Sequence, residues 1–176
     1  MSALKEVVKE TTVACISSDE FKQGMSAFPG AVSIVTTEVH NNKVGFTATA
    51  VCSVSDNPPT LLVCLNRGAS VYKTFCESDS LVINTLDASQ DHLSNLFGGK
   101  APMEQRFASA TWETLVTGAP VLTDAAVSFD CKIIEVKSVA THDVFFCEVV
   151  DIKQKQQAGS LVYYQRGYHR LCKDID

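Results

Sequence analysis

Apolar and hydroxyl-bearing residues alternate along residues 45–55, and this alternation predicts a β-strand. Successive side chains of a strand point to opposite faces, so one face of this strand would be lined largely by hydroxyls. One set of alternating positions holds Phe46, Ala48, Ala50, Cys52 and Val54, and the other holds Thr47, Thr49, Val51, Ser53 and Ser55.

A turn and a buried strand follow. Residues 56–59, Asp-Asn-Pro-Pro, predict the turn, because proline fixes φ and lacks the N–H that a paired central strand needs. Residues 60–65 form a nearly continuous apolar run, which is typical of a strand buried on both sides. Residues 66–70, Asn-Arg-Gly-Ala-Ser, then form a polar loop with one cation. This loop and the hydroxyl face could cradle a polar, anionic ligand; the alternative is a solvated sheet face beside an ordinary loop.

The N-terminal part of the chain predicts a helix followed by a hairpin. Ser17 and Glu20 have the spacing of a capping box, and an apolar stripe with helical spacing follows them. Pro29 and Gly30 end this helix. Residues 31–39 predict a strand, and Asn41-Asn42 predicts its hairpin turn, because Asn tolerates a positive φ. The stripe consists of Phe21, Met25 and Phe28.

The rest of the chain predicts more strands than helices. Ser70 and Ser89 are expected to cap two short helices, and Gly98-Gly99 ends the second one. Residues 100–123 are expected to form a long ordered loop. With about seven strands in succession, a mostly antiparallel β-barrel with a few short flanking helices fits better than a doubly wound sheet. The remaining predicted strands are residues 81–86, 125–136, 144–152 and 161–164, with a turn around residues 141–143.

Composition and charge exclude several classes. The 176 residues are 45% apolar and 20% charged, as in an ordinary globular domain, and we expect an N-terminal extension (1–16) and one domain (17–176). A net charge of −5 without a basic stripe argues against nucleic acid as a partner. No apolar run reaches the ~18 residues of a membrane span. The seven cysteines include no C-x-x-C pair, which favours a reduced cytoplasmic protein without a disulfide framework or zinc site.

The familiar catalytic motifs are absent. The sequence has no G-x-G-x-x-G, no P-loop, no G-x-S-x-G and no H-E-x-x-H. A Cys or Ser nucleophile paired with His142 or His169 would make a hydrolase, but no local pattern supports it. The four histidines are far apart in sequence, so no metal site is expected.

Residues 45–59 resemble the flavin-binding signature of the short-chain flavin reductases, which supply reduced flavin to two-component monooxygenases. Further blocks are similar to one branch of this family, the FMN reductases of the Rut pyrimidine-utilisation pathway. The reductase component of 4-hydroxyphenylacetate 3-monooxygenase is similar in residues 47–56 and 141–142. The blocks of the FMN reductase branch are LNRGASV (65–71), LSNLFGGK (93–100), PMEQRF (102–107), VSFDC (127–131) and THD (141–143).

This resemblance implies a split β-barrel, a homodimer, FMN or FAD as the flavin, and NADH as the reductant. It also implies a partner monooxygenase that receives the reduced flavin. A Gly-Asp-His triplet that many relatives share is Ala140-Thr141-His142 here, so only its histidine is kept.

Roles for single residues follow from the resemblance. His142 is the candidate catalytic residue, with a surface or structural histidine as the alternative, and the same choice applies to His169 near the nicotinamide. Arg106 either contacts phosphate or pairs with an acid. The candidate flavin ligands are Thr47, Ala48, Thr49 and Ala50 along the isoalloxazine edge, Ser53, Ser55, Arg67 and Ser70 at the phosphate, and the neighbouring Leu65 and Asn66.

Two other functional classes fit the same sequence. One is a flavin-binding split-barrel protein without reductase activity, such as an electron carrier or a storage protein. The other is a β-barrel that binds a ligand other than flavin.

Overall fold

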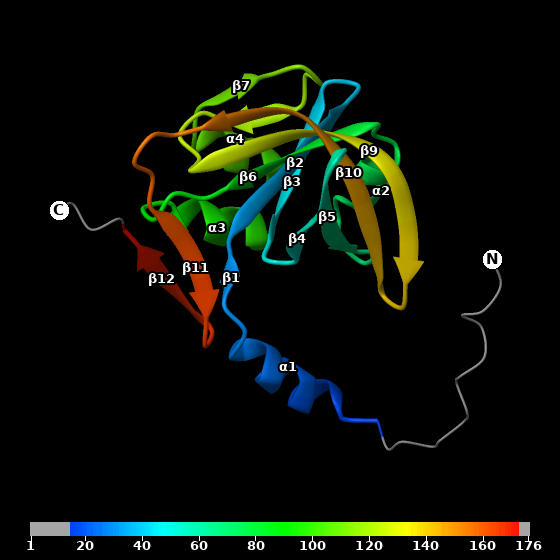
Figure 1. Cartoon of the computed structure of the whole chain (residues 1–176), viewed down its shortest axis with the longest axis vertical. Helices are drawn as coiled ribbons and strands as arrows, with labels where there is room; N and C mark the ends of the chain where they lie inside the picture. Colours follow the sequence, from blue (N-terminus) through cyan, green and yellow to red (C-terminus); the bar gives the residue numbers. More distant parts are fainter. Residues whose placement is uncertain (1–14, 173–176) are drawn as a thin grey trace.

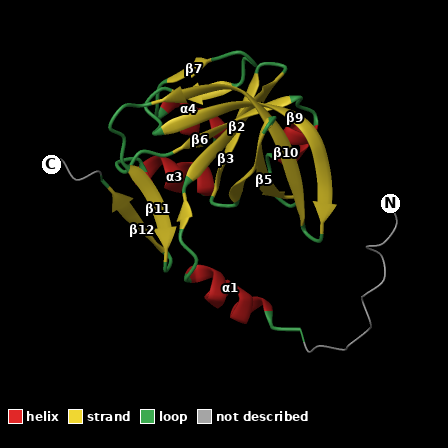
Figure 2. Ribbon diagram, in the orientation of Figure 1, coloured by secondary structure: helices red, strands yellow, loops and turns green. Residues whose placement is uncertain are grey.

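The computed structural model describes residues 15–172, which form twelve strands and four helices (Figures 1 and 2). The predicted extension, residues 1–16, therefore lies almost wholly outside the described residues. The helices are α1 (Ser18–Ser26), α2 (Tyr72–Cys76), α3 (Asp91–Gly98) and α4 (Met103–Ala108). The strands are β1 (Gly30–Ala31), β2 (Ser33–Val39), β3 (Asn42–Ala48), β4 (Val51–Asp56), β5 (Pro59–Asn66), β6 (Ser80–Thr85), β7 (Trp112–Thr114), β8 (Pro120–Leu122), β9 (Val127–Val139), β10 (His142–Gln154), β11 (Ser160–Tyr164) and β12 (Gly167–Leu171).

Seven antiparallel strands form the main sheet, in the order β3-β2-β6-β9-β10-β5-β4. Strands β3 and β4 are consecutive in the chain but lie at opposite ends of this order. The sheet therefore curls into a barrel that is split between them (Figure 1). A three-stranded sheet, β1-β11-β12, and the β7-β8 pair complete the fold. The prediction of a mainly antiparallel split barrel with a few short flanking helices is confirmed.

Helix α1 begins as predicted but lies apart from the barrel (Figure 2). Ser17 Oγ accepts from the Glu20 N–H at 3.2 Å, and Glu20 accepts from the Ser17 N–H at 2.8 Å, which is the reciprocal pattern of a capping box. The helix has no buried residue, so its apolar stripe is uncovered. The Gln165 N–H donates to Ser26 O at 2.7 Å and ties α1 to the β11–β12 turn.

The first hairpin turn lies one residue earlier than predicted. Val39 pairs with Asn42, so the turn consists of His40 and Asn41, and Asn42 already belongs to β3. The φ angles of His40 and Asn41 are 51° and 63°. Two successive positive φ values match the twist of the flanking strands, and Asn41 is the kind of residue that tolerates them.

Two predictions for the middle of the chain are wrong. The alternating stretch is not one strand, because the chain turns at Thr49 and Ala50 and sends β3 and β4 to opposite ends of the sheet. Residues 100–123 are not a long loop, because they contain α4, β7 and β8. Strand β5 is not buried on both sides as predicted, since Val63 and Leu65 are buried but Leu61, Leu62 and Cys64 are partly exposed.

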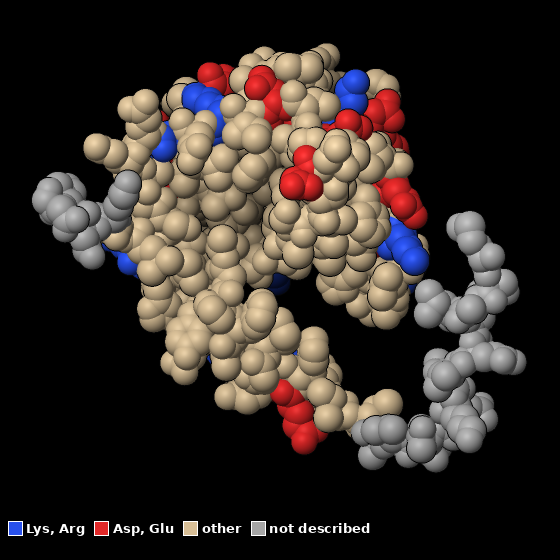
Figure 3. Space-filling view, viewed as in Figure 1, with Lys and Arg blue, Asp and Glu red and all other residues tan. Residues whose placement is uncertain are grey.

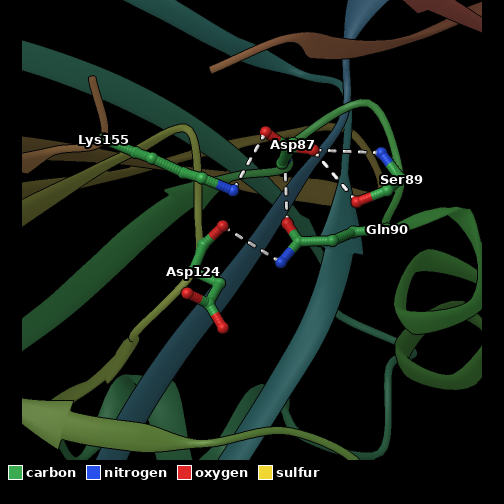
Figure 4. A network of polar contacts seen from close by, with 5 residues as sticks. All are labelled: Asp87, Ser89, Gln90, Asp124 and Lys155. Carbon is green, nitrogen blue, oxygen red and sulfur yellow. Dashed lines mark hydrogen bonds and ion pairs between the residues drawn. The ribbon is translucent and has the colours of Figure 1, made fainter. Parts of the chain in front are cut away.

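Ser89 does not cap α3, because its hydroxyl donates to Asp87 Oδ1 at 3.0 Å (Figure 4). The residue before the helix is Gln90, whose side chain accepts from the Asp87 N–H and donates to Asp124 O. Lys155 forms an ion pair with Asp87 across the same network. These contacts join the loop before α3 to the segments that flank β9 and β10.

Two large apolar clusters and a small third one, formed by Val82, Ala119 and Val121, make up the core. The first fills the barrel, and the second packs α3 against β2 and the C-terminal sheet. Gly45 permits the close approach of α3, because a Cβ there would lie 2.9 Å from Phe97 Cε1. Within residues 15–172, no helix is both long enough and apolar enough to cross a bilayer. The first cluster includes Val35, Val63, Leu65, Phe75, Leu81, Ile83, Cys131, Phe145 and Cys147, and the second Ile34, Leu86, Leu93, Phe97, Leu122 and Leu161.

Candidate functional site

A cleft of about 410 Å³ lies at the split of the barrel. Its walls are the β3–β4 corner, the end of β5 with the loop that follows it, and the end of α3. The fold brings these segments together at the split, although the β3–β4 corner and the end of α3 are about fifty residues apart in the chain. Of the predicted site residues, eight line the cleft: Thr47, Ala48, Thr49, Ala50, Leu65, Asn66, Ser70 and His142.

The β3–β4 corner presents backbone as well as hydroxyls. Strand β3 lies at the edge of the sheet, so its outer side lacks a neighbouring strand. Thr47 Oγ1 donates to Ser94 O at 2.7 Å, which fixes the end of β3 on α3. Thr49 and Ala50 are exposed at the turn itself. A flat ligand can therefore contact this corner through backbone groups and the exposed Thr49 hydroxyl.

The β5–α2 loop is held in a defined shape by its own polar groups. Asn66 Oδ1 accepts from the Gly68 N–H at 2.8 Å, and the Arg67 N–H donates to Thr141 O at 3.1 Å. The prediction that Ser70 caps α2 is wrong. The residue before this five-residue helix is Val71, and it makes no side-chain capping hydrogen bond. The Ser70 side chain is thus free of a capping role and lies at the cleft wall.

Arg67 belongs to this loop but is not among the cleft residues. Its guanidinium donates to Ala140 O, and its Nε lies 3.9 Å from Asp143 Oδ1. Asp143 is buried and accepts from Tyr72 OH at 2.6 Å. This hydrogen bond raises the pKa of Tyr72 well above its usual range and, with the Arg67 charge, lowers the pKa of Asp143. The loop, α2 and the β9–β10 turn are thereby linked through one carboxylate.

His142 lies at the mouth of the cleft and is exposed. The prediction placed it in a turn, but it is the first residue of β10 and pairs with Asn66 of β5. Ala140 takes the positive φ of the turn, 49°. The His142 Nδ1 lies 2.9 Å from Thr141 Oγ1, so the ring is oriented by its neighbour.

Besides Arg67, three predicted ligands lie outside the cleft. Ser53 and Ser55 belong to β4, beyond the corner that separates them from Thr47. Ser55 Oγ accepts from the Asn57 N–H at 3.1 Å. His169 is exposed on β12 of the smaller sheet, with its ring 5.7 Å from the Tyr164 ring. The single hydroxyl face predicted for residues 45–55 does not form, because the corner breaks it.

Arg106 is a cleft residue whose contacts the sequence did not indicate. It comes from α4 and is 7% exposed. Its guanidinium donates to the carbonyls of Phe97, Gly99 and Ala101 at 2.8–2.9 Å. Of the two predicted roles, pairing with an acid is not seen, because no ion pair within residues 15–172 includes Arg106. The Gly98-Gly99 pair ends α3 and leaves its last carbonyls as acceptors for a nearby cation.

A larger apolar groove of about 590 Å³ lies next to the cleft, between α1 and the barrel. Met25, Phe28, Leu62 and Tyr163 are among its lining residues. In the view of Figure 3, charged side chains gather mainly at the upper margin, and the surface above α1 is largely uncharged. Three residues, Thr49, Ala50 and Cys64, line both the groove and the cleft.

Within residues 15–172, no three His, Cys, Asp or Glu side chains are grouped to hold a metal ion. Burial raises the pKa of the Cys64 thiol, so this cleft residue is not activated as a thiolate nucleophile. The arrangement therefore suits the binding and orientation of a flat, anionic ligand better than hydrolysis.

Comparisons with known proteins agree with this geometry. The FMN reductase (NADH) RutF of Acinetobacter baylyi is 52% identical over 168 residues, which cover 96% of this chain and 89% of that protein. A solved structure from Haemophilus somnus 129PT has a TM-score of 0.87 and 47% identity over 89% of this chain and 100% of its own. The flavin reductase HpaC, solved with NADP⁺, gives a TM-score of 0.81 and 30% identity over 88% and 98% of the two chains. Because residues 25–172 also match the family directly, the chain belongs to the flavin reductase-like domain family.

Proposed function

We propose that this protein is an NADH-dependent FMN reductase that supplies reduced flavin to a partner monooxygenase. The observation that carries the proposal is the cleft at the barrel split, in a chain that is 52% identical to an FMN reductase (NADH) over nearly its whole length. We further propose that residues 17–176 form one flavin reductase-like domain. FAD is the alternative flavin.

The cleft fits a flavin in size and in chemistry. Its volume of about 410 Å³ falls within the range of small-molecule sites, roughly 300–1,000 Å³. The β3–β4 corner offers backbone groups and the Thr49 hydroxyl to a ring edge, and the Asn66–Ser70 loop offers polar groups to a phosphate. Arg67 belongs to this loop, its side chain is 43% exposed, and its guanidinium is the group proposed to meet the phosphate.

In this proposal the protein acts by orientation. When bound together, NADH and the flavin supply the hydride chemistry themselves, from nicotinamide C4 to flavin N5. The corner at Thr47–Ala50 holds one ring in place, and holding two rings in near-attack geometry lowers the barrier substantially. His142 at the mouth is the candidate contact to the nicotinamide. Ser53, Ser55 and His169 stay predictions, since they lie outside the cleft.

We also propose a homodimer with the flavin site close to the subunit boundary. The predicted apolar stripe is uncovered: Phe21 and Met25 of α1, and Phe28 two residues beyond its end, are 57%, 47% and 70% exposed. This stripe borders the apolar groove, which shares residues with the cleft. A second copy that covers the groove would bury the stripe and complete the wall beside the site.

A cytoplasmic location completes the proposal. All seven cysteines are unpaired, and four of them are exposed. Unpaired exposed cysteines are typical of proteins in a reducing compartment.

The decisive experiment adds NADH to purified protein with FMN, FAD, riboflavin or no flavin and follows absorbance at the NADH band. We expect NADH consumption only with flavin, with FMN at least as good as FAD. Tight FMN binding without NADH consumption would favour a carrier or storage protein. Absence of flavin binding would favour a barrel with a different ligand, and flavin-independent oxidation would also exclude the proposal.

A further inference from the structure

Arg106 is a buried cation in the cleft wall without a counter-ion among the described residues. Arg106 is 7% exposed, and it takes part in no ion pair within residues 15–172. Burying a charge is costly unless the charge is paired. A buried unpaired cation that also lines a cleft indicates that the missing negative charge comes from a ligand.

The backbone carbonyls around Arg106 compensate its charge only in part. Phe97 O and Gly99 O lie at the C-terminal end of α3, where a helix dipole carries about half a negative charge. Ala101 O accepts the third hydrogen bond. The guanidinium therefore keeps part of its positive charge, and its residue lines the cleft.

The guanidinium also has donors to spare. Arginine has five N–H donors in a rigid fork, and three are used by the carbonyls of Phe97, Gly99 and Ala101. The three bonds lock the fork in one orientation, so a ligand that uses the remaining donors need not order the side chain itself. Gly98 and Gly99 line the cleft beside Arg106 and place no side chain on this part of its wall.

We propose that Arg106 is a binding residue for an anionic group of the flavin. This inference rests on the proposed function, since it takes the flavin as the occupant of the cleft. Two flavin groups have the required chemistry: the phosphate of FMN, and the N1–C2 carbonyl region of the ring, which becomes negative on reduction. The same cationic fork serves either group, and binding measurements separate them.

The test uses the full chain with Arg106→Gln and Arg106→Lys, and Arg170→Gln as the matched control. Arg170 is 61% exposed at its side chain and pairs with Asp91 on the surface, away from the cleft residues. Affinities are measured for FMN and riboflavin, each oxidised and each reduced chemically with dithionite under anaerobic conditions. Because no NADH is used, the result is independent of turnover.

Arg106→Gln should weaken binding of the anionic ligand by about 10- to 100-fold, as for loss of a charge-assisted hydrogen bond. A larger loss for FMN than for riboflavin assigns Arg106 to the phosphate, and a larger loss for the reduced than for the oxidised flavins assigns it to the ring. Arg106→Lys should recover part of the loss, and Arg170→Gln should bind like the wild type. Equal losses for all four ligands, or none, would overturn the inference. If the wild type binds no flavin at all, the proposed function fails instead.

Arg106→Gln could fail to fold, because its hydrogen bonds hold the end of α3. Wild-type protein labelled with ¹⁵N-arginine then provides the test, with the Arg106 Nε signal assigned from its loss in Arg106→Lys. The signal should shift on addition of FMN and shift differently with oxidised riboflavin or with reduced FMN. An Arg106 signal that responds identically to all of these ligands would refute a contact with a flavin anion.

Discussion

Phe28→Ala tests whether the apolar stripe of α1 is an interface between two copies of the chain. Phe28 is 70% exposed in the single chain and lines the groove beside the cleft. Fully burying a phenylalanine side chain stabilises by about 1.5–3 kcal/mol. Scaled by its exposed fraction, Phe28 would contribute about 1–2 kcal/mol per protomer in a dimer.

A twofold dimer contains this contact twice, so the substitution should cost about 2–4 kcal/mol of association free energy. Since a tenfold change corresponds to about 1.4 kcal/mol, the dimer dissociation constant should rise about 30- to 700-fold. The thermal stability of the separated protomer should change little, because the side chain is uncovered there.

The assay is sedimentation velocity with a fluorescent label, from nanomolar to micromolar protein. Val116→Ala is the control, because Val116 is similarly exposed, at 67%, but lies between β7 and β8, away from α1 (Figure 1). A wild type that stays monomeric and active at micromolar concentration would refute the dimer. A Phe28→Ala dimer as tight as the wild type would refute the placement of the interface on α1.

Three further predictions concern the cleft and its support. Arg67→Ala should weaken FMN by about one to two decades and riboflavin far less, from loss of a charge-assisted contact of about 1.5–3 kcal/mol; equal losses in parallel titrations would place Arg67 away from the phosphate. His142→Ala should slow stopped-flow reduction of bound FMN by NADH while flavin affinity is nearly kept, and a collapse of flavin binding alone would assign His142 to the flavin instead. Tyr72→Phe should lower thermal stability near neutral pH, because Tyr72 stabilises the ionised Asp143 and lowers its pKa. That stability difference should be fully present above the unfolded-state pKa, near ~3.9, and should vanish as the pH falls through the lower folded-state pKa; a difference that persists in acid would contradict this explanation.

The elements that short-range signals specify were predictable from the sequence. The capping box of Ser17 and Glu20 forms as expected, because both partners lie within one helical turn. The antiparallel class of the fold followed from strands in direct succession. Asn41 was correctly identified as a turn residue, although the turn begins one residue earlier, because cross-strand register fixes its exact position.

The missed features depend on contacts between distant segments. The alternation of apolar and polar residues continues through Thr49 and Ala50, so the pattern could not reveal that β3 and β4 part there. Ser89 has the composition of a helix cap, but its hydroxyl is taken by Asp87. The requirement for glycine at position 45 arises from the docking of α3 and is not visible in the local sequence.

The candidate site was predictable only in part, because some of its residues are brought together by contacts between distant segments. Its contiguous segments, Thr47–Ala50 and the Asn66 loop, were found through local pattern and family resemblance. Arg106 was placed by the docking of α4 on the end of α3, which brings three carbonyls to one guanidinium. Ser53 and Ser55 lie outside the cleft, because the face that they were expected to share with Thr47 is interrupted.

Thr49, Ala50 and Cys64 line both the cleft and the apolar groove, which limits how the protein can be re-engineered. In the proposed dimer, a larger side chain at any of these positions would alter ligand fit and subunit contact at once, so the two properties could not be optimised independently there. Libraries aimed at a different flavin preference are better directed at Ser70 and its loop, which lines the cleft alone. Libraries aimed at assembly state are better directed at Met25 and Phe28, which line only the groove.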